Sequence, residues 1–554
     1  MDMESFEANT IPLTTLTAPS ATTVIKEPDL ITILEDMPLT NEQIEEEQDL
    51  LEEADDEFEL NESTPLIRSH ETLEKSDSSF FTHNSKSFTT TFTTSQASLF
   101  IPSFQFSLYS SVVSISRSLN QRSVTLSIED RSSQDSKSKT TTLLEKLSED
   151  GQASTILALW NMINMIFAST SVLAMPYAIV LGGFAALFLI LFIGFLTDIT
   201  SVVLVGCLYE ISPKSRFRKR VRASYAEIAA HVWGPVGGWI VDFVTVSLSY
   251  CSCVLMVMAL GSSFMELFKE LITFNIKEWC LICALAMLPT VFIKRLSILA
   301  WLSMLAVVAV FIIAFILLGF TLEESNSWTL DKIPSFNIDT FPLSLGIILF
   351  SYCGHTVFPG IEGSMQKPNK YKSVSHRAFI SVTTVKFLVG LFCCLSFGSY
   401  TRSIVILNLS SSYGSALSKL ATVLVIINIY FSYPLNMFVV SGTLDIVILP
   451  KLPLYYNHKY YNYLWVISTR TFLVLSTLGI AVAVPHFGLL MSIFGSLFGA
   501  CVTLIFPCLF HLQLKWNKLT LYKKVFEMLI VLFGIIAGTL GLIYSSIALK
   551  NAGD

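Results

Sequence analysis

Residues 350–360 read Phe350-Ser351-Tyr352-Cys353-Gly354-His355-Thr356-Val357-Phe358-Pro359-Gly360. This stretch lies inside an apolar segment long enough to cross a membrane, yet it contains small polar residues, two glycines and a proline. A helix inside a bilayer satisfies its own backbone groups, so an interrupted helix there needs a reason. The stretch therefore predicts a transmembrane helix that is broken near its middle.

A second interrupted stretch occurs earlier in the chain. It reads Ala168-Ser169-Thr170-Ser171-Val172-Leu173-Ala174-Met175-Pro176-Tyr177. Three hydroxyl-bearing residues precede a proline, which removes one backbone hydrogen bond and clashes with the turn before it. The stretch predicts either a second break or a proline kink that the neighbouring Ser and Thr side chains fill.

Eleven apolar segments are candidate transmembrane helices, since about 20 apolar residues cross the hydrocarbon core. They are 155–180, 183–209, 238–262, 278–294, 297–319, 342–364, 377–398, 415–447, 463–483, 486–510 and 525–549. The interrupted segments are the first and the sixth, so they open two blocks of five helices. Such a matched pair indicates an inverted-repeat transporter, with half-helix N-termini toward a substrate carboxylate and freed carbonyls toward a cation. We expect an all-α polytopic membrane fold with a 5+5 inverted repeat plus one helix.

Lys and Arg residues in the short loops predict the orientation, because they are enriched on the cytosolic side. With the N-terminus in the cytosol, the cytosolic loops carry 18 of these residues and the opposite loops carry 5. The C-terminus is then expected to be lumenal. Asn408, in an Asn-Leu-Ser sequon, lies on the lumenal side, where glycosylation is possible.

The composition excludes a soluble enzyme and a secreted disulfide scaffold. Hydrophobic residues make up 52% of the 554-residue chain and charged residues 14%, with a mean hydropathy of +0.60. Soluble proteins carry about 25% charged residues. The ten cysteines lie within or beside the predicted helices, where packing is their expected role. No metal-ligand spacing, Walker-type loop or catalytic triad pattern is visible, so we expect no metal, no cofactor, no enzyme activity and no nucleic-acid partner.

Residues 1–150 differ from the rest of the chain. They contain 28 Asp/Glu against 10 Lys/Arg, and 76–143 is dominated by Ser and Thr. Such a segment buries too little apolar surface to offset the entropy of ordering it. We expect a disordered cytosolic tail over 1–150 and a transporter domain over 151–554. Two pieces of the tail resemble acidic dileucine sorting signals read by clathrin adaptors: Glu46 with Leu50 and Leu51, and Glu62 with Leu66 and Ile67.

Ionisable residues inside the membrane are costly and are functional candidates. His355 lies in the second interrupted stretch, and its side chain changes charge near neutral pH, which makes it the first candidate for proton coupling. Lys386 and Asp198 lie inside the seventh and second predicted helices and need a partner, a lost proton or access to water. Acids near helix ends, Glu210, Glu362 and Asp445, are expected at interfaces or gates, with Arg470 as an end charge or a partner for one of them.

The substrate is expected between the two interrupted helices. The residues expected to line its site are Ser169, Thr170, Ser171, Ala174, Ser351, Tyr352 and Gly354. The basic loop 214–220 is expected to anchor the topology and to contact anionic lipid headgroups.

The body of the chain resembles the amino acid/auxin permease superfamily, and most closely its vesicular inhibitory amino acid (GABA/glycine) transporter branch. The segments that carry the resemblance are 171–178 (SVLAMPYA) with Gly182 and Gly183, 207–210 (CLYE), 341–347 (FPLSLGI), 359–368 (PGIEGSMQKP), 484–491 (VPHFGLLM) and 509–512 (LFHL). The stretch Tyr352–Pro359 is more similar to plant and fungal vacuolar amino acid permeases. The resemblance implies an eleven-helix fold like that of the bacterial leucine transporter, and proton-linked amino acid transport.

These observations favour a secondary transporter that exchanges protons for a small neutral amino acid across the membrane of an intracellular vesicle, lysosome or vacuole. An amino acid exporter of the lysosome or vacuole, with the same fold and the opposite direction, is an alternative, because alternating access works both ways. A sensor that binds an amino acid without transporting it, and signals through its tail, is a third reading.

Overall fold

The computed structural model describes residues 153–167, 169–211, 218–292, 296–328, 336–413, 416–448, 452 and 459–553. The side chain of Ser169 and the tail, with both predicted sorting signals, lie outside the described part. The helices are α5 (Thr155–Phe167), α6 (Ser169–Gly182), α7 (Phe184–Gly206), α8 (Tyr225–Phe268), α9 (Ile276–Val291), α10 (Leu296–Glu323), α11 (Phe341–Ser351), α12 (Phe358–Ser364), α13 (Tyr371–Phe397), α14 (Ile406–Tyr413), α15 (Ala416–Val447), α17 (Lys459–Ala483), α18 (Phe487–Phe494), α19 (Phe506–Lys515) and α20 (Leu521–Gly553).

The fold is mostly helical and polytopic. Within the described residues, eight helices are long and apolar enough to cross a membrane, and the bent pair α5–α6 makes a ninth candidate. Helix α9, with 16 residues, and α11, with 11, are shorter than the other candidates. Each of the eleven predicted segments coincides with a helix or a pair of helices, and the count of eleven depends on including α9 and the pair α11–α12.

Two short strands correct the all-α expectation. Strands β1 (Tyr209–Ile211) and β2 (Arg218–Arg220) pair antiparallel beyond the end of α7. Glu210 faces Lys219 in this pairing, and opposite charges at facing positions stabilise a two-stranded ribbon. The loop that the sequence analysis treated only as a basic anchor therefore has a defined structure at both of its ends.

Helix α8 begins well before the predicted segment 238–262. Ser224 caps its first turn by accepting a hydrogen bond from the Glu227 backbone N–H at 3.2 Å. The helix kinks at Gly234, whose φ of 71° suits a residue without a side chain, and it continues from Pro235. The first part of this helix is not predicted from the sequence because it is short and precedes the apolar run.

The first interrupted span breaks earlier than its proline suggested. Helix α5 ends at Phe167, α6 begins at Ser169, and the two are bent by 48°. Ser and Thr favour the first positions of a helix, so the hydroxyl-bearing run starts α6. Pro176 lies inside α6, where the Val405 backbone N–H donates to the Leu173 carbonyl at 3.0 Å, one turn before the proline. The break is therefore eight residues or more before Pro176, rather than at it.

The second interrupted span breaks within the stretch that predicted it. Helix α11 ends at Ser351, α12 begins at Phe358, and Pro359 lies in the first turn of α12. Proline is tolerated in this position because the N–H that it lacks has no partner within the helix.

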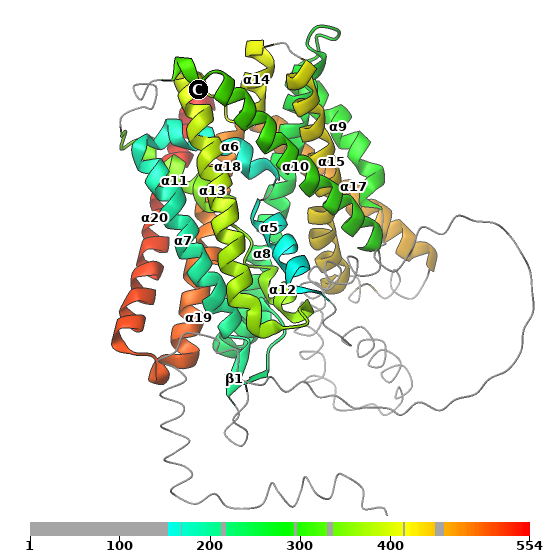
Figure 1. Cartoon of the computed structure of the whole chain (residues 1–554). Helices are drawn as coiled ribbons and strands as arrows, with labels where there is room; N and C mark the ends of the chain where they lie inside the picture. The colour runs from blue at the N-terminus through cyan, green and yellow to red at the C-terminus, as the bar shows by residue number, and fades with distance from the viewer. Residues whose placement is uncertain are drawn as a thin grey trace, which may run out of the picture. The chain divides into compact units, whose positions relative to one another are not determined.

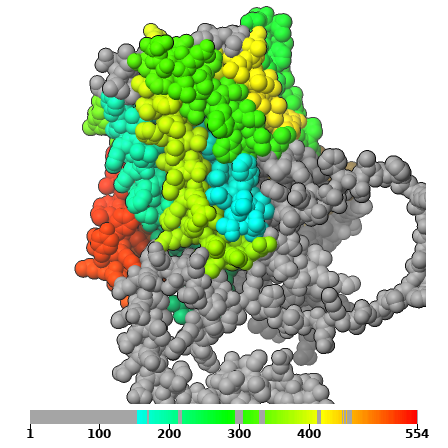
Figure 2. Space-filling view, viewed as in Figure 1, coloured from blue at the N-terminus to red at the C-terminus, as the bar shows by residue number. Residues whose placement is uncertain are grey.

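The four half-helices occupy two levels of the bundle. Figure 1 shows α6 and α11 in its upper half and α5 and α12 in its lower half. The chain before α5 is joined to the end of α12 by a parallel bridge, in which Ala153 donates to Ser364 and Gln366 donates to Ala153, both at 3.0 Å. In Figure 2 the cyan surface of α5 adjoins the yellow-green surface of α13.

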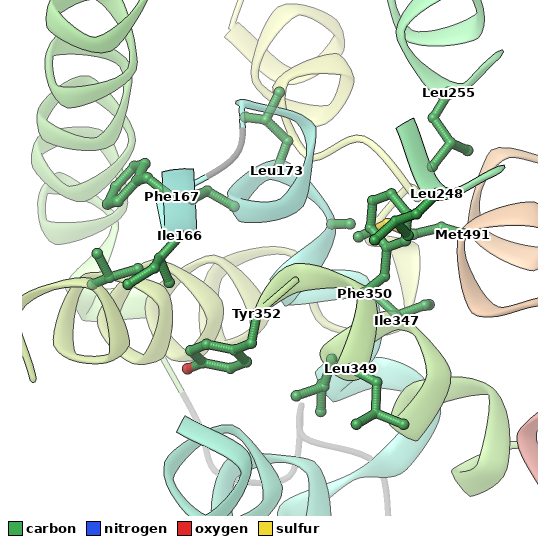
Figure 3. Packing of buried hydrophobic residues seen from close by; sticks show 14 of the residues in the cluster. Ile166, Phe167, Leu173, Leu248, Leu255, Ile347, Leu349, Phe350, Tyr352 and Met491 are labelled. Atoms are coloured by element: carbon green, nitrogen blue, oxygen red, sulfur yellow. The ribbon is translucent and has the colours of Figure 1, made fainter. Parts of the chain in front are cut away.

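Buried apolar side chains surround the breaks. Figure 3 shows side chains from α5, α6, α8, α11 and α18 around Tyr352 and Phe350. Between α18 and α19 two π-helical segments, Gly495–Gly499 and Cys501–Ile505, lie within one continuous span. A side chain at Gly495 would overlap the Gly346 carbonyl of α11, so glycine at both positions lets these helices pack closely.

Candidate functional site

Lys386 joins the two interrupted spans. It lies in the middle of α13 and is fully buried. Its Nζ donates to the Ile166 carbonyl at 2.9 Å and to the Ser351 carbonyl, and lies 4.4 Å from the centre of the Tyr352 ring. Ile166 precedes the last residue of α5, and Ser351 is the last residue of α11. One amino group therefore contacts the end of α5 and the end of α11, which are the first halves of the two interrupted spans.

This position suits a positive charge. The last four carbonyls of a helix have no partner within the helix, and the macrodipole makes that end negative. The face of an aromatic ring adds a further attraction for a cation. An ammonium in a membrane interior needs such partners, because it is costly to bury without them. Lys386 thus occupies a place where freed carbonyls would otherwise bind a cation.

Tyr352 anchors the second break to two neighbouring helices. Its hydroxyl lies 3.1 Å from the Ile190 carbonyl of α7 and 3.2 Å from the Thr383 hydroxyl of α13. The ring stays under the Lys386 amino group because its far end is held by these bonds. Figure 3 shows Tyr352 extending from the end of α11 on the same side as Ile166.

The structure brings only some of the predicted substrate residues together. Ser351 and Tyr352 meet at Lys386, whereas Thr170 and Ala174 are buried within α6. The hydroxyls of Ser171 and Ser351 donate at 2.8 Å to carbonyls of their own spans, Phe167 and Ile348. A side chain at Gly354 would meet Phe358 at 2.9 Å and approach Ile166 at 3.6 Å, so the second break lies close to α5.

His355 lies against α7. Its Nε2 is 2.9 Å from the Thr200 hydroxyl and 3.2 Å from the Thr197 carbonyl, and its Nδ1 has no hydrogen-bond partner among the described residues. The ring of Phe358 is 5.0 Å from the His355 ring, and Phe379 is 6.0 Å from Phe358 and 6.5 Å from Tyr352. A row of aromatic rings therefore connects the His355 side of the break with the Lys386 side.

Asp198 has partners that the sequence analysis did not identify. Its carboxylate accepts a hydrogen bond from the Ser375 hydroxyl at 2.7 Å and pairs with Nδ1 of His376. The Ser201 and Ser375 hydroxyls are 2.6 Å apart. His376 precedes the predicted segment 377–398 but belongs to the first turns of α13.

The charged residues near helix ends form pairs. Glu362 in α12 is buried and receives the Tyr209 hydroxyl, and one of its oxygens lies 3.5 Å from Nε of Arg220. Burial and the Glu362 carboxylate raise the pKa of Tyr209 above its usual value, so its hydroxyl remains a donor. Arg220 also donates to the Pro359 carbonyl at 2.8 Å, which ties strand β2 to the start of α12.

Two further acids are paired as well. Arg470 donates to Asp445 at 2.9 Å, which joins α17 to α15, so the structure selects Asp445 among the acids considered for this arginine. Glu210 pairs with Arg222 beside the hairpin.

The predicted glycosylation site is not open in this structure. Asn408 is buried, its amide nitrogen donates to the Tyr400 carbonyl at 2.8 Å, and its amide oxygen accepts from the Arg402 backbone at 2.8 Å. A glycan on that nitrogen would break the first of these bonds and would have to be attached before the turn forms.

No cluster of three His, Cys, Asp or Glu side chains in the described part of the chain has the arrangement of a metal site. The site is instead a break in two spans, closed by one amino group, with buried polar side chains on both sides. Broken spans of this kind are typical of secondary transporters, whose binding sites lie where the helices are interrupted.

The chain belongs to the transmembrane amino acid transporter protein family, whose model matches residues 151–549. The family and the relatives below are transporters, so the chain is not an enzyme.

The chain is 31% identical to the vesicular inhibitory amino acid transporter of Homo sapiens over 70% of this chain and 74% of that protein. It is 27% identical to the vesicular GABA transporter of Caenorhabditis elegans over 74% and 84% of the two chains. It is 28% identical to amino acid transporter AVT1E of Arabidopsis thaliana over 69% and 71%. The inward-facing structure of Mhp1 aligns with a TM-score of 0.42 at 13% identity, over 72% of this chain and 91% of that one.

Proposed function

We propose that this protein is a proton-coupled secondary transporter that carries a small neutral amino acid of the GABA or glycine kind across vesicle membranes in exchange for protons. The observation that carries the proposal is the contact of the Lys386 amino group with the ends of both first half-helices. The names of the human and nematode relatives supply the substrate class and the vesicle.

The break between α5 and α6 offers groups suited to an amino acid. The backbone N–H groups at the start of α6 are those that bind carboxylates at helix N-termini. The residues proposed to line the substrate site are Ser169, Thr170, Ser171, Ala174, Ser351, Tyr352 and Gly354. Small side chains dominate this set, which favours a substrate without a bulky side chain.

Lys386 supplies a mechanism for coupling. As an ammonium it stabilises the ends of α5 and α11 through hydrogen bonds worth about 1.5–3 kcal/mol each, which are weakened when the proton leaves. The ends of α5 and α11 are then no longer held together by the Lys386 amino group, a contact called the Lys386 clamp below, and the half-helices are free to move. His355 and Asp198 are proposed as further coupling residues, because both are buried titratable groups near the second break.

The transport fold is proposed to contain eleven spans, arranged as two inverted blocks of five and one final helix, as in the bacterial leucine transporter. The breaks in the first and sixth predicted spans support this arrangement. The distribution of Lys and Arg supports an N-terminus in the cytosol and a C-terminus in the lumen.

Residues 1–150 are proposed to form a disordered cytosolic tail ahead of the transporter domain over 151–554. Glu46, Leu50 and Leu51, and Glu62, Leu66 and Ile67, are proposed to bind clathrin adaptors through two apolar anchors and one charge. Replacing both apolar pairs with alanine is expected to move the protein to the cell surface, which surface biotinylation measures.

The test of the proposal uses purified full-length protein in sealed vesicles with an acidic interior. Labelled GABA and glycine are expected to accumulate inside, and an uncoupler is expected to abolish the accumulation. Uptake that continues after the pH gradient has collapsed contradicts proton coupling. Binding of an amino acid without any flux favours the sensor instead, and efflux from preloaded vesicles of known sidedness measures the direction of transport.

A further inference from the structure

A second polar cluster joins α7 to α13 away from Lys386. It consists of Asp198 and Ser201 from α7 and of Ser375 and His376 from α13. Asp198 accepts from Ser375 at 2.7 Å and pairs with Nδ1 of His376, while Ser201 bonds to Ser375 at 2.6 Å and to the Asp198 carbonyl at 2.8 Å. Every oxygen of the Asp198 carboxylate therefore has a partner on α13.

The two members of the ion pair differ in their access to solvent. The side chain of His376 is 40% exposed, whereas that of Asp198 is 12% exposed. Nδ1 of His376 faces the Asp198 carboxylate, so Nε2 is the ring nitrogen left for other partners. The pair thus combines a buried carboxylate with a histidine side chain that water reaches.

The acid on α12 near this pair is neutralised by other groups, and α13 carries the cations Lys372 and Arg377 beside His376 in sequence. On α12, Glu362 pairs with Arg220 of the hairpin and receives the Tyr209 hydroxyl. On α13, the buried Tyr371 lies within electrostatic range of Asp198 and Glu362. On α7, the neighbours Thr197 and Thr200 bond to His355. Loss of the proton from His376 therefore leaves the Asp198 charge uncompensated by this cluster.

One face of α13 carries Ser375 of this cluster and Lys386. Ser375, Phe379 and Thr383 follow one another at intervals of four residues, the spacing of one helix face. Thr383 bonds to Tyr352, under Lys386, whereas Ser375 bonds to Asp198. Phe379, in contact with Phe358 and Tyr352, lies between them and forms an aromatic barrier. The helix thus carries two protonatable side chains, His376 and Lys386, with the apolar ring of Phe379 between them.

We propose that His376, held by Asp198, is the residue through which protons enter or leave the transport path at the end where α13 begins. The proposal rests on the proton coupling proposed above and adds a second site to it. A proton bound at Nε2 of His376 passes to water on that side of the membrane, and the neutral ring accepts another from the side of the break once the half-helices have moved and the aromatic barrier at Phe379 has opened. Lys386 and His376 would then be loaded and unloaded at different stages of the cycle.

The test compares His376→Gln and His376→Arg with the wild type in sealed vesicles, with His231→Gln as a control because His231 is an exposed histidine on α8. Counterflow measures exchange of labelled amino acid without a pH gradient, and gradient-driven accumulation measures coupling. We expect both His376 variants to retain counterflow, and their gradient-driven accumulation to fall about fivefold or more with a flattened pH profile.

The arginine variant separates proton exchange from a structural role. Arg keeps a positive charge beside Asp198 but does not release a proton. If His376→Arg restores both the accumulation and the pH profile of the wild type, the pair only holds α7 against α13, and the proposal is overturned. Unchanged coupling in His376→Gln overturns it as well. A wild-type protein that shows counterflow but no response to a pH gradient contradicts the proposed function itself, which is a different result.

Discussion

The amino group of Lys386 lies 2.9 Å from the carbonyl oxygen of Ile166, so the middle of α13 is bonded to the end of α5. The same group also binds the Ser351 carbonyl at the end of α11. Two helices from different halves of the proposed repeat therefore share one donor. A change of charge at this donor acts on both of them at once.

Lys386→Met tests this clamp. Methionine fills a similar volume but leaves the carbonyls of Ile166 and Ser351 without their donor, which removes bonds worth about 1.5–3 kcal/mol each. We expect counterflow in sealed vesicles to fall about tenfold or more. Lys277→Met is the matched control, since Lys277 is exposed at the start of α9. A variant at 386 that transports and couples like the control would contradict the role of the clamp.

Thr200→Val tests the environment of His355. Valine keeps the shape of threonine but removes the hydroxyl that lies 2.9 Å from Nε2 of His355. Nε2 then keeps only the Thr197 carbonyl at 3.2 Å. The loss of one hydrogen bond is worth about 0.5–1.5 kcal/mol, so we expect the free energy of unfolding in detergent to fall by that amount. Thr539→Val is the control, because the Thr539 hydroxyl is exposed and bonds within its own helix. Equal effects of the two substitutions would show that His355 does not depend on Thr200.

Gly346→Ala tests the close packing of α11 against the π-helical span. A methyl group at 346 would overlap the hydroxyls of Ser492 and Ser496, and overpacking of this kind costs about 1–3 kcal/mol. Gly479→Ala is the control, because nothing lies within 4 Å of a methyl group there. A glycine-to-alanine change in an open helix position is expected to stabilise by up to about 1 kcal/mol. Thermal unfolding measures the stability of both variants. A Gly346→Ala variant more stable than Gly479→Ala would contradict the close contact.

The pair of Arg470 and Asp445 predicts an asymmetry. The side chain of Arg470 is 5% exposed and that of Asp445 is 25% exposed, so water reaches the acid more easily than the base. Asp445→Asn leaves a buried cation without its counter-ion and is expected to cost about 3–5 kcal/mol, whereas Arg470→Met is expected to cost less. The double variant should recover part of the loss. Chemical unfolding that gives additive effects would mean that the two residues do not interact.

The broken spans were predictable from sequence to different degrees. Gly354 and Pro359 mark the second break because Gly354 leaves room for the Phe358 ring and Pro359 suits the start of α12. Pro176 was a poor guide to the first break. A proline removes only one hydrogen bond, and the surrounding helix tolerates it, while Ser169 begins the new helix. The hydroxyl-bearing residues therefore mark the first break better than the proline does.

The partners of the buried charges were not predictable from sequence. Lys386 was expected to need a partner, but helix-end carbonyls carry no sequence signal, and neither Ile166 nor Ser351 has a side chain that indicates the contact. His376 was overlooked because a polar residue at the start of an apolar helix is typical of a loop. Its pairing with Asp198 depends on how α7 and α13 pack, and hydropathy contains no information about that packing.

The bridge between Ala153 and Met365 has a mechanical consequence. Ala153 is the first described residue after the N-terminal segment, and its backbone N–H and carbonyl are both bonded to the chain at the end of α12. Tension applied to the chain before 153, for instance by a protein that binds the N-terminal segment, would act on α5 and α12 together.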